Sequence, residues 1–478
     1  MDKARRTHLQ EHVVVLGGGI AGLSAADSLS KAGMRVTVIE ERDACGGTHR
    51  SRSIGPYTFD VGSIFYESNA RLFNLAPGLR EMCPQVIRRQ RRIAPGGGLA
   101  HYPLEPREFL RRPPRELAAA LMDLAASRFA VRRDGSLAAI STQRLGQRFF
   151  AQTGLRSYIT RFHHVPPEEV SESFFFHRMA FIEKATRPRE MARLALRALL
   201  SRGSVAGRPR PALHVRPREG YAPLFAAITD RLAERGVDIR TATALRTISA
   251  SNGTYRIETD HGSLDATAVV SALPLDTLHR ALFGAPSGLT SLGMTTLFVS
   301  AAQLSSDTGN VLFNFDTRGR WKRATIYSRI YPEPQMPREF FAVECTLPPG
   351  CEHAPKDVFA DFRDHLSAVD LARDLRLEGH EHVPDCYPLY RPGTEAILHD
   401  TLARIEGQGI VLAGRQGRFE YLPTSSGVIR RVGEELARAA LPANPGPTNE
   451  QALCPVTSPP PGPDRSPTGG LPTMPSHS

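Results

Sequence analysis

The chain has 478 residues, 41% of them hydrophobic and 23% charged, so it is long enough for about two or three globular domains. This composition excludes a small disulfide-stapled scaffold, and no apolar run approaches the roughly 20 residues of a membrane-spanning helix. The six cysteines form no CxxC pair, which predicts free thiols and no metal site. The N-terminal stretch MDKARRTHLQEH is charged and has no apolar signal region, which predicts a cytoplasmic protein.

The net charge of +11 comes mainly from arginines that are spread along the chain. We find no RNA-binding signature and no recognition-helix motif, so we predict no nucleic-acid partner. Arginine pairs bidentately with phosphate and carboxylate groups, which suits a cofactor diphosphate or an anionic small-molecule substrate. Peripheral contact with an anionic membrane surface stays open as an alternative, and the sequence does not define the oligomeric state.

The first segment in chain order is predicted to form a strand, a glycine turn, a helix and a second strand. Val13–Leu16 are a short β-branched run, typical of a strand that is buried on both faces. Gly17, Gly19 and Gly22 form a GxGxxG motif, which allows a tight turn, close approach to a pyrophosphate and helix–strand packing. Glu40 ends the second strand, where its carboxylate can accept hydrogen bonds from an adenosine ribose. The segment therefore predicts a dinucleotide site.

The remainder of the chain alternates between helical, mixed and sheet-like stretches. Residues 116–133 and 190–203 are predicted helices with a basic solvent-facing stripe, and membrane contact is the less favoured alternative. Residues 220–275 return to helices and strands, and residues 296–347 contain four predicted strands of an antiparallel sheet. The Pro-rich end of the chain predicts a disordered tail over 442–478.

The residues that follow the second strand connect the glycine motif with a known group of flavoproteins. EERDACGGTHRS places Gly46 and Gly47 shortly after the ribose acid. This continuation resembles the superfamily of FAD-dependent amine oxidases, protoporphyrinogen oxidases, phytoene desaturases and UDP-galactopyranose mutases. The resemblance implies FAD, with the double glycine close to the flavin. It also implies that Thr48, Arg50 and Ser51 lie near the diphosphate. No cysteine or histidine lies close to Gly414 in the sequence, which predicts that the FAD is bound non-covalently.

Four further segments extend the resemblance over most of the chain before the tail. YTFDVGSIFYESN contains Asp60 and Gly62 at the positions of a family segment that runs along the isoalloxazine ring. HYPLEP resembles the step before the substrate domain, and GYAPLF resembles the segment before the helix that returns to the FAD domain. AVVSALPLDTL resembles a strand and proline turn near the flavin.

Two later segments, DCYPLY and LAGRQGRFEY, indicate a particular branch. They resemble UDP-galactopyranose mutase-like and bacterial protoporphyrinogen oxidase-like members, and Arg415 follows Gly414 as in the mutase-like proteins. A guanidinium at this position would pair with the FAD diphosphate. The motif and the resemblance together assign cofactor contacts to Gly17, Gly19, Ile20, Ala21, Gly22, Glu40, Glu41, Gly46, Gly47, Thr48, Arg50, Gly62, Ser63, Gly414 and Arg415.

The chain also departs from the mutases at two flavin-facing positions. Tyr421 is followed by LPTSSG where the mutases have an Asp-Met-Asp-like segment, and Ser63 stands where they have a histidine. We therefore expect flavin-facing chemistry that differs from that of the mutases. The resemblance gives three candidate substrate contacts, which are Arg178, Arg323 and Tyr390.

Three functions remain in view. The favoured one is an FAD-dependent oxidoreductase that transfers a hydride from a C–N or C–C bond of a small molecule to flavin N5. The first alternative is a UDP-galactopyranose mutase-like isomerase of sugar nucleotides, and the second is a non-catalytic flavin-binding assembly protein. Convergence of Arg178, Arg323 and Tyr390 would favour the isomerase, and an aromatic, uncharged cavity would favour oxidation.

The predicted fold class is α/β, with a doubly wound Rossmann-like FAD-binding domain and an inserted α+β substrate domain. The FAD-binding domain is predicted from residues 8–95, 211–285 and 396–440. The substrate domain is predicted from a helical insertion over 96–210 and an antiparallel sheet over 286–395.

Overall fold

The computed structural model describes residues 11–102, 113–179, 182, 183, 186, 187, 189, 190, 193, 212–251 and 253–441. At His177 and Arg178 only the main chain is described. The predicted tail over 442–478 and most of the predicted helix over 190–203 lie outside the described residues.

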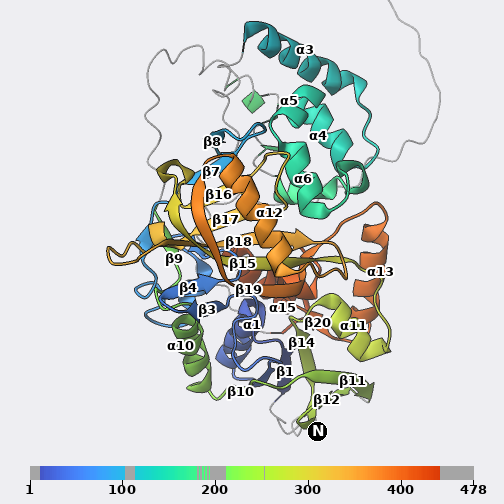
Figure 1. Cartoon of the computed structure of the whole chain (residues 1–478). Helices are drawn as coiled ribbons and strands as arrows, with labels where there is room; N and C mark the ends of the chain where they lie inside the picture. The colour runs from blue at the N-terminus through green and yellow to red at the C-terminus, as the bar shows by residue number, and fades with distance from the viewer. Residues whose placement is uncertain are drawn as a thin grey trace, which may run out of the picture. The chain divides into compact units, whose positions relative to one another are not determined.

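A parallel sheet underlies the glycine motif (Figure 1). Its strands are β1 (His12–Leu16), β2 (Arg35–Ile39), β10 (Asp238–Arg240), β14 (Ala268–Ser271) and β20 (Val411–Leu412). They pair in the order β10-β2-β1-β14-β20, and every pair is parallel, with Val13 opposite Val36 on one side and Ala268 on the other. The strand, turn, helix and strand predicted for the start of the chain are thereby confirmed.

The two faces of this sheet are covered by different elements. Val13 and Val15 pack towards helices on one face, and Val14 and Leu16 pack towards an antiparallel meander and helices on the other. The first face is covered by α1 (Ile20–Lys31), α10 (Ala222–Ala233) and α15 (Ser425–Arg438). The second is covered by β11 (Leu245–Ser251), β12 (Thr254–Thr259), β13 (Gly262–Ala266), α11 (Leu275–Phe283) and α13 (Thr394–Glu406). The predicted fold class is confirmed, with the meander replacing part of the second helical layer.

A second sheet is built from β7 (Gln90–Ile93), β8 (Leu99–His101), β15 (Ser291–Leu304), β16 (Val311–Asn314), β17 (Arg323–Ile326), β18 (Glu339–Leu347) and β19 (Ala372–Pro388). Its order is β19-β15-β18-β17-β16-β7-β8, and only β16 and β7 pair in parallel. The strands predicted over 296–347 are confirmed. Sequence reasoning missed β19 because its charged, largely unburied residues give no apolar strand pattern.

Short helices lie beyond this second sheet and are drawn in cyan and green in Figure 1. They are α3 (Pro114–Ala130), α4 (Leu137–Leu145), α5 (Gln147–Gln152), α6 (Leu155–His163) and α7 (Ser173–Arg178). The predicted helix over 116–133 is confirmed as α3, but the basic outward stripe is wrong. Its outward face is apolar, with Leu121, Met122 and Phe129 all exposed. Among the helices of the described ranges, none has the length and apolar composition needed to cross a bilayer.

Smaller elements join these layers. They are β3 (Ser51–Ile54), β4 (Tyr57–Asp60), β5 (Phe65–Tyr66), β6 (Gln85–Val86), β9 (Leu213–Val215), α12 (Pro355–Ala368) and α14 (Gly414–Gly417). Helix α12 packs Phe362 and Leu366 against the second sheet. At the end of β4, the buried carboxylate of Asp60 accepts a bifurcated hydrogen bond from the Nε–H of Arg216, with Nε at 3.1 Å from Oδ1 and 2.9 Å from Oδ2. This ion pair links β4 to the segment that follows β9.

Candidate functional site

A cavity of about 980 Å³ extends from the glycine turn into the helical part of the chain. One end lies at the carboxyl ends of β1, β2 and β14, which is the edge where open parallel sheets bind ligands. The other end is walled by α6, α7, β16 and β17. The cavity therefore connects the parallel sheet with the helices and the second sheet.

The glycine turn leaves open space in front of the N-terminus of α1. Gly17 has a φ of +97°, which favours glycine, and its N–H donates to the Ile39 carbonyl oxygen at 2.8 Å. A Cβ added at Gly19 would have Gly47 as its nearest neighbour, at 3.7 Å. A Cβ at Gly22 would lie only 1.8 Å from the Gly17 carbonyl oxygen, so Gly22 allows α1 to pack against the turn.

Glu40 is held by the main chain at the end of β2. Its Oε2 accepts from the Gly18 N–H at 2.7 Å and its Oε1 accepts from the Arg42 N–H at 3.1 Å. Burial raises the pKa of Glu40, and the two N–H groups act in the opposite direction. The side chain lines the cavity, where each carboxylate oxygen can accept another hydrogen bond.

Three buried polar atoms at this end of the cavity have no hydrogen-bond partner among the described residues: Arg50 Nε, Arg415 Nε and Ser425 Oγ. Arg50 is anchored through Nη2 to Glu381 at 2.8 Å, and Arg415 through Nη2 to the Cys386 carbonyl oxygen at 2.6 Å. Buried polar atoms without partners indicate a ligand that supplies them. Two guanidinium groups, a hydroxyl and the N-termini of α1 and α15 fit a diphosphate.

His49 also lines the cavity, and sequence reasoning did not single it out. Burial, with a further contribution from Arg415, lowers the pKa of His49 to about 4. The imidazole is therefore neutral at neutral pH. Its ring contacts Tyr221 edge-on at a centroid distance of 5.3 Å. The signal that the sequence offered was its place two residues after the double glycine.

Most of the predicted cofactor contacts line the cavity. They are Gly17, Gly19, Ile20, Ala21, Glu40, Glu41, Gly46, Gly47, Thr48, Arg50, Gly62, Ser63 and Arg415. Gly22 and Gly414 are not among the lining residues, because both serve helix packing: a Cβ at Gly414 would lie 2.3 Å from Ala21 Cβ. These two glycines shape the site without facing it.

The three candidate substrate contacts do not converge. Arg323 lines the cavity. Tyr390 does not, because its hydroxyl donates to the Phe419 carbonyl oxygen at 2.6 Å and its ring packs in the core behind the parallel sheet. The structure therefore corrects the prediction for Tyr390. Arg178 ends α7, and its side chain lies outside the described part of the chain.

Aromatic side chains that sequence reasoning missed line the far end of the cavity. Tyr102 stacks on Phe313 at a centroid distance of 3.8 Å, and Tyr158 stacks on Phe315 at 4.6 Å. The apolar walls are completed by Phe65, Leu155, Ile159, Phe174, Met179 and Met294. We call this end the aromatic chamber. Its residues come from segments far apart in the sequence, so no local pattern could reveal it.

A buried charge cluster borders the aromatic chamber. Lys322 Nζ lies 2.9 Å from Glu344 Oε2 and donates to Tyr387 Oη at 2.8 Å. Arg323 Nε donates to Glu344 Oε1 at 3.0 Å. Burial acts to raise the pKa of Glu344, but Arg323 and Lys322 lower it to about 2. Tyr387 connects the two ends of the cavity, because its ring lies 4.2 Å from Lys322 Nζ and 4.9 Å from Arg415 Cζ.

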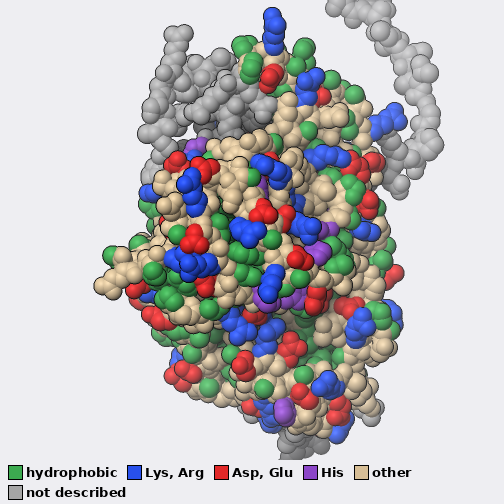
Figure 2. Space-filling model, in the orientation of Figure 1, with side chains coloured by type: hydrophobic (Ala, Val, Ile, Leu, Met, Phe, Trp, Pro, Cys, Tyr) green, Lys and Arg blue, Asp and Glu red, His purple; other side chains and the backbone are tan. Residues whose placement is uncertain are grey.

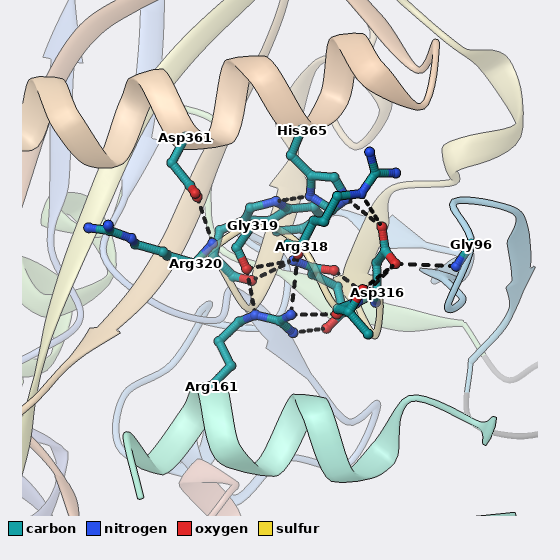
Figure 3. Close-up of polar contacts among 11 residues, drawn as sticks. Gly96, Arg161, Asp316, Arg318, Gly319, Arg320, Asp361 and His365 are labelled. Atoms are coloured by element: carbon teal, nitrogen blue, oxygen red, sulfur yellow. Dashed lines mark hydrogen bonds and ion pairs between the residues drawn. The ribbon is translucent and has the colours of Figure 1, made fainter. Parts of the chain in front are cut away.

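Figure 3 shows how Arg161 of α6 holds the loop between β16 and β17. Its guanidinium donates to four main-chain carbonyl oxygens of residues 314–319. Asp361 and His365 of α12 bond to the same loop from the other side. Since the loop leads directly into Lys322, this network positions one wall of the aromatic chamber.

Comparison with known proteins assigns the family. Residues 20–325, more than half of the chain, match the family described as flavin containing amine oxidoreductase. The chain therefore belongs to this family, whose cofactor is FAD. The superfamily and the cofactor predicted from the sequence are confirmed.

Individual relatives match smaller parts of the chain. The probable polyamine oxidase 4 of Arabidopsis thaliana is 38% identical over 79 residues, which is 16% of either protein. The carotenoid phi-ring synthase of Streptomyces griseus is 28% identical over 318 residues, 59% of this chain and 56% of that protein. The matches thus span about one sixth to about one half of these relatives. The crystal structure of reduced UDP-galactopyranose mutase shares the fold, with a TM-score of 0.72 at 17% identity, over 90% of this chain and 96% of that one.

Proposed function

We propose that FAD binds along this cavity with its diphosphate at the glycine turn and its adenosine ribose at Glu40. The unpartnered Arg50 Nε, Arg415 Nε and Ser425 Oγ support this placement, because a diphosphate supplies the acceptors that they need. The open space in front of Gly19 supports it too, because only a main chain without side chains allows close approach there. The isoalloxazine end then faces Gly62, Ser63 and the aromatic chamber.

We infer that the chain is an oxidoreductase that removes a hydride from a C–N or C–C bond of a small molecule. Bound FAD supplies the hydride acceptor. The chain's own side chains orient the substrate and exclude water, which is the task of the stacked pairs Tyr102–Phe313 and Tyr158–Phe315. When a hydride leaves the carbon beside a neutral amine nitrogen, the product is an iminium ion, so this reaction needs no proton acceptor from the protein. Tyr387 lines the cavity and its Oη accepts a hydrogen bond from Lys322 Nζ, so the O–H can donate to the substrate and orient it.

The continuity between the glycine turn and the aromatic chamber is the observation that supports this reading most directly. An isomerase of sugar nucleotides would need free arginines at the substrate diphosphate. Arg323 instead shares the carboxylate of Glu344, and Tyr390 lies elsewhere. The isomerase stays the second candidate because Lys322 and Arg415 both lie against the Tyr387 ring, within reach of an anionic group.

An absorbance spectrum of the purified protein, followed by denaturation, tests the cofactor, and anaerobic mixing with candidate substrates tests the reaction. We expect released FAD and bleaching of the flavin band by an amine or a polyene, with one oxidised product for each flavin reduced. Turnover of a UDP-sugar only after dithionite reduction, with no net electron transfer, would assign the isomerase. A colourless protein that cannot be reconstituted with FAD would contradict the proposed site.

A further inference from the structure

Helix α3 is apolar on two opposite faces, and only one of them is covered by the described chain. The inner face packs Ala120 and Leu124 against Phe149. The outer face, at helical spacing, consists of Ala118, Leu121, Met122, Ala125 and Phe129, all of them exposed. Figure 1 shows α3 at the outer edge of the helical part, and Figure 2 shows hydrophobic side chains around it.

The exposure of this outer face is large. Leu121 is 51% exposed, Met122 67% and Phe129 91%. The outer side of a helix on a water-soluble domain is normally polar, and an isolated exposed leucine needs no explanation. Several large apolar side chains on one stripe of one helix do need one, because contiguous apolar patches mark interaction sites.

Basic residues border this stripe. Arg128 of α3 donates to the Thr186 carbonyl oxygen at 2.7 Å, which brings the segment after α7 alongside the helix. In that segment Arg187, Arg189 and Arg193 are exposed. The described acids of this segment are paired with arginines, Glu183 with Arg144 and Arg187, and Glu190 with Arg193 at 3.8 Å. Arg128, Arg144 and the three exposed arginines outnumber these two acids, so this segment and its contacts carry a net positive charge, which complements an anionic surface.

The same helices connect this stripe with the cavity. Helix α3 packs on α4 and α5, which lead into α6 and α7. Leu155, Ile159, Phe174 and Met179 of α6, α7 and the residue after α7 line the aromatic chamber. The exposed stripe thus lies on the part of the chain that walls the apolar end of the cavity.

We propose that the outer face of α3 docks on an anionic lipid bilayer, with the helix axis parallel to the membrane plane. Leu121, Met122 and Phe129 enter the interface between headgroups and acyl chains, and the neighbouring arginines contact lipid phosphates. Helix α3 has 17 residues and remains at the surface, in agreement with the finding on membrane-spanning helices above. The proposed docking does not depend on the reaction proposed for the cavity.

Co-sedimentation with vesicles tests the surface. The probes are vesicles of phosphatidylcholine alone and vesicles of phosphatidylcholine with phosphatidylglycerol. We expect the wild-type protein to bind the anionic vesicles and to bind neutral ones at least about 10-fold more weakly. The triple variant Leu121→Ser, Met122→Ser, Phe129→Ser should lose at least about 10-fold in affinity for the anionic vesicles. The variant Arg189→Gln, Arg193→Gln should lose several-fold on the same vesicles and nothing on neutral ones.

The matched control is Ile87→Ser with Ile397→Ser, since both isoleucines are exposed hydrophobic side chains away from α3, at 53% and 44%. This control should bind like the wild type, and flavin absorbance and thermal melting should show that every variant is folded. Equal binding by the triple variant and the wild type overturns the proposal. So does a wild-type protein that ignores both vesicles and forms a dimer which the triple variant disrupts, because the stripe would then cover a second copy.

Discussion

The walls at the two ends of the cavity differ in how much of them is main chain and how much is side chain. At the glycine turn, Gly17, Gly19, Gly46 and Gly47 leave main chain without side chains in the wall, and arginines that line the space, Arg50 and Arg415, are anchored elsewhere by hydrogen bonds. At the aromatic chamber the walls are side chains from distant segments, packed around one buried charge cluster. Substitutions that add side-chain atoms should therefore be tolerated least at the glycine turn. Substitutions that remove a charge or a hydroxyl group should have their largest effects at the aromatic chamber.

The largest effect should come from Gly19→Val. The valine needs no unusual main-chain conformation, since Gly19 has a φ of −76°. Its methyl groups would instead occupy the space in front of α1, where the proposed diphosphate lies. We expect a folded protein that retains no FAD, measured as the ratio of flavin to protein absorbance after gel filtration. A yellow, FAD-loaded Gly19→Val protein would remove the diphosphate site from the glycine turn.

Gly433→Val is the matched control for this experiment. Gly433 lies within α15, and nothing would lie within 4 Å of a Cβ there. The same substitution should raise the free energy of unfolding by less than about 1 kcal/mol, because valine has the higher helix propensity, and should leave the flavin ratio unchanged. Loss of flavin in both variants would mean that valine acts through general destabilisation and not through the cofactor space.

The second-largest effect should be a loss of folding stability at the charge cluster beside the aromatic chamber. Glu344→Gln removes the carboxylate that Lys322 and Arg323 share and leaves two cations beside a largely buried site. We expect the free energy of unfolding to fall by about 3–5 kcal/mol in urea titrations. Glu339→Gln on the same strand is the control, because Glu339 pairs with Arg329 at a more exposed position and should cost about 1 kcal/mol or less. Equal losses of unfolding free energy in the two variants would show that the buried Glu344 cluster stabilises the fold no more than the more exposed Glu339 pair.

Glu344 also gives an expectation for acid stability. The folded-state pKa of Glu344 is about 2, compared with an ordinary value of 4.5, because Arg323 and Lys322 outweigh burial. A lowered folded-state pKa stabilises the folded protein above the unfolded-state value, and this stabilisation is lost as the pH falls from about 4.5 towards 2. Thermal melting across this range should show a steeper fall for the wild type than for Glu344→Gln. Parallel curves would contradict the assignment.

The third effect separates two tyrosines that lie three residues apart. Tyr387→Phe removes a hydroxyl that faces the cavity and is bonded to Lys322. If this hydroxyl orients the substrate by a hydrogen bond, the rate constant of anaerobic flavin reduction should fall by about 10-fold while the KM changes little. An unchanged rate would leave Tyr387 as a wall of the chamber only.

The sequence predicted the main-chain end of the cavity well and the side-chain end poorly. The glycine spacing, Glu40 and the double glycine follow one another closely along the chain, so a local pattern identified residues that now line one cavity. The aromatic chamber unites Tyr102, Tyr158 and Phe313 through the fold alone. The resemblance of DCYPLY to mutase-like proteins also placed Tyr390 at the site, although Tyr390 packs in the core behind the parallel sheet. Side-chain direction at the end of a long strand could not be read from spacing.

The smallest effect should come from Tyr390→Phe, the counterpart of Tyr387→Phe. Burial raises the pKa of Tyr390, so its hydroxyl stays protonated and donates to the Phe419 carbonyl oxygen, behind the parallel sheet and away from the cavity. Removing one such hydrogen bond should cost about 1 kcal/mol of unfolding free energy. The kcat and KM should equal those of the wild type, because no atom of Tyr390 lines the cavity. A fall in kcat for both tyrosine variants would mean that this core and the chamber act as one unit, whereas a fall for Tyr387→Phe alone would locate the hydroxyl that orients the substrate at the chamber.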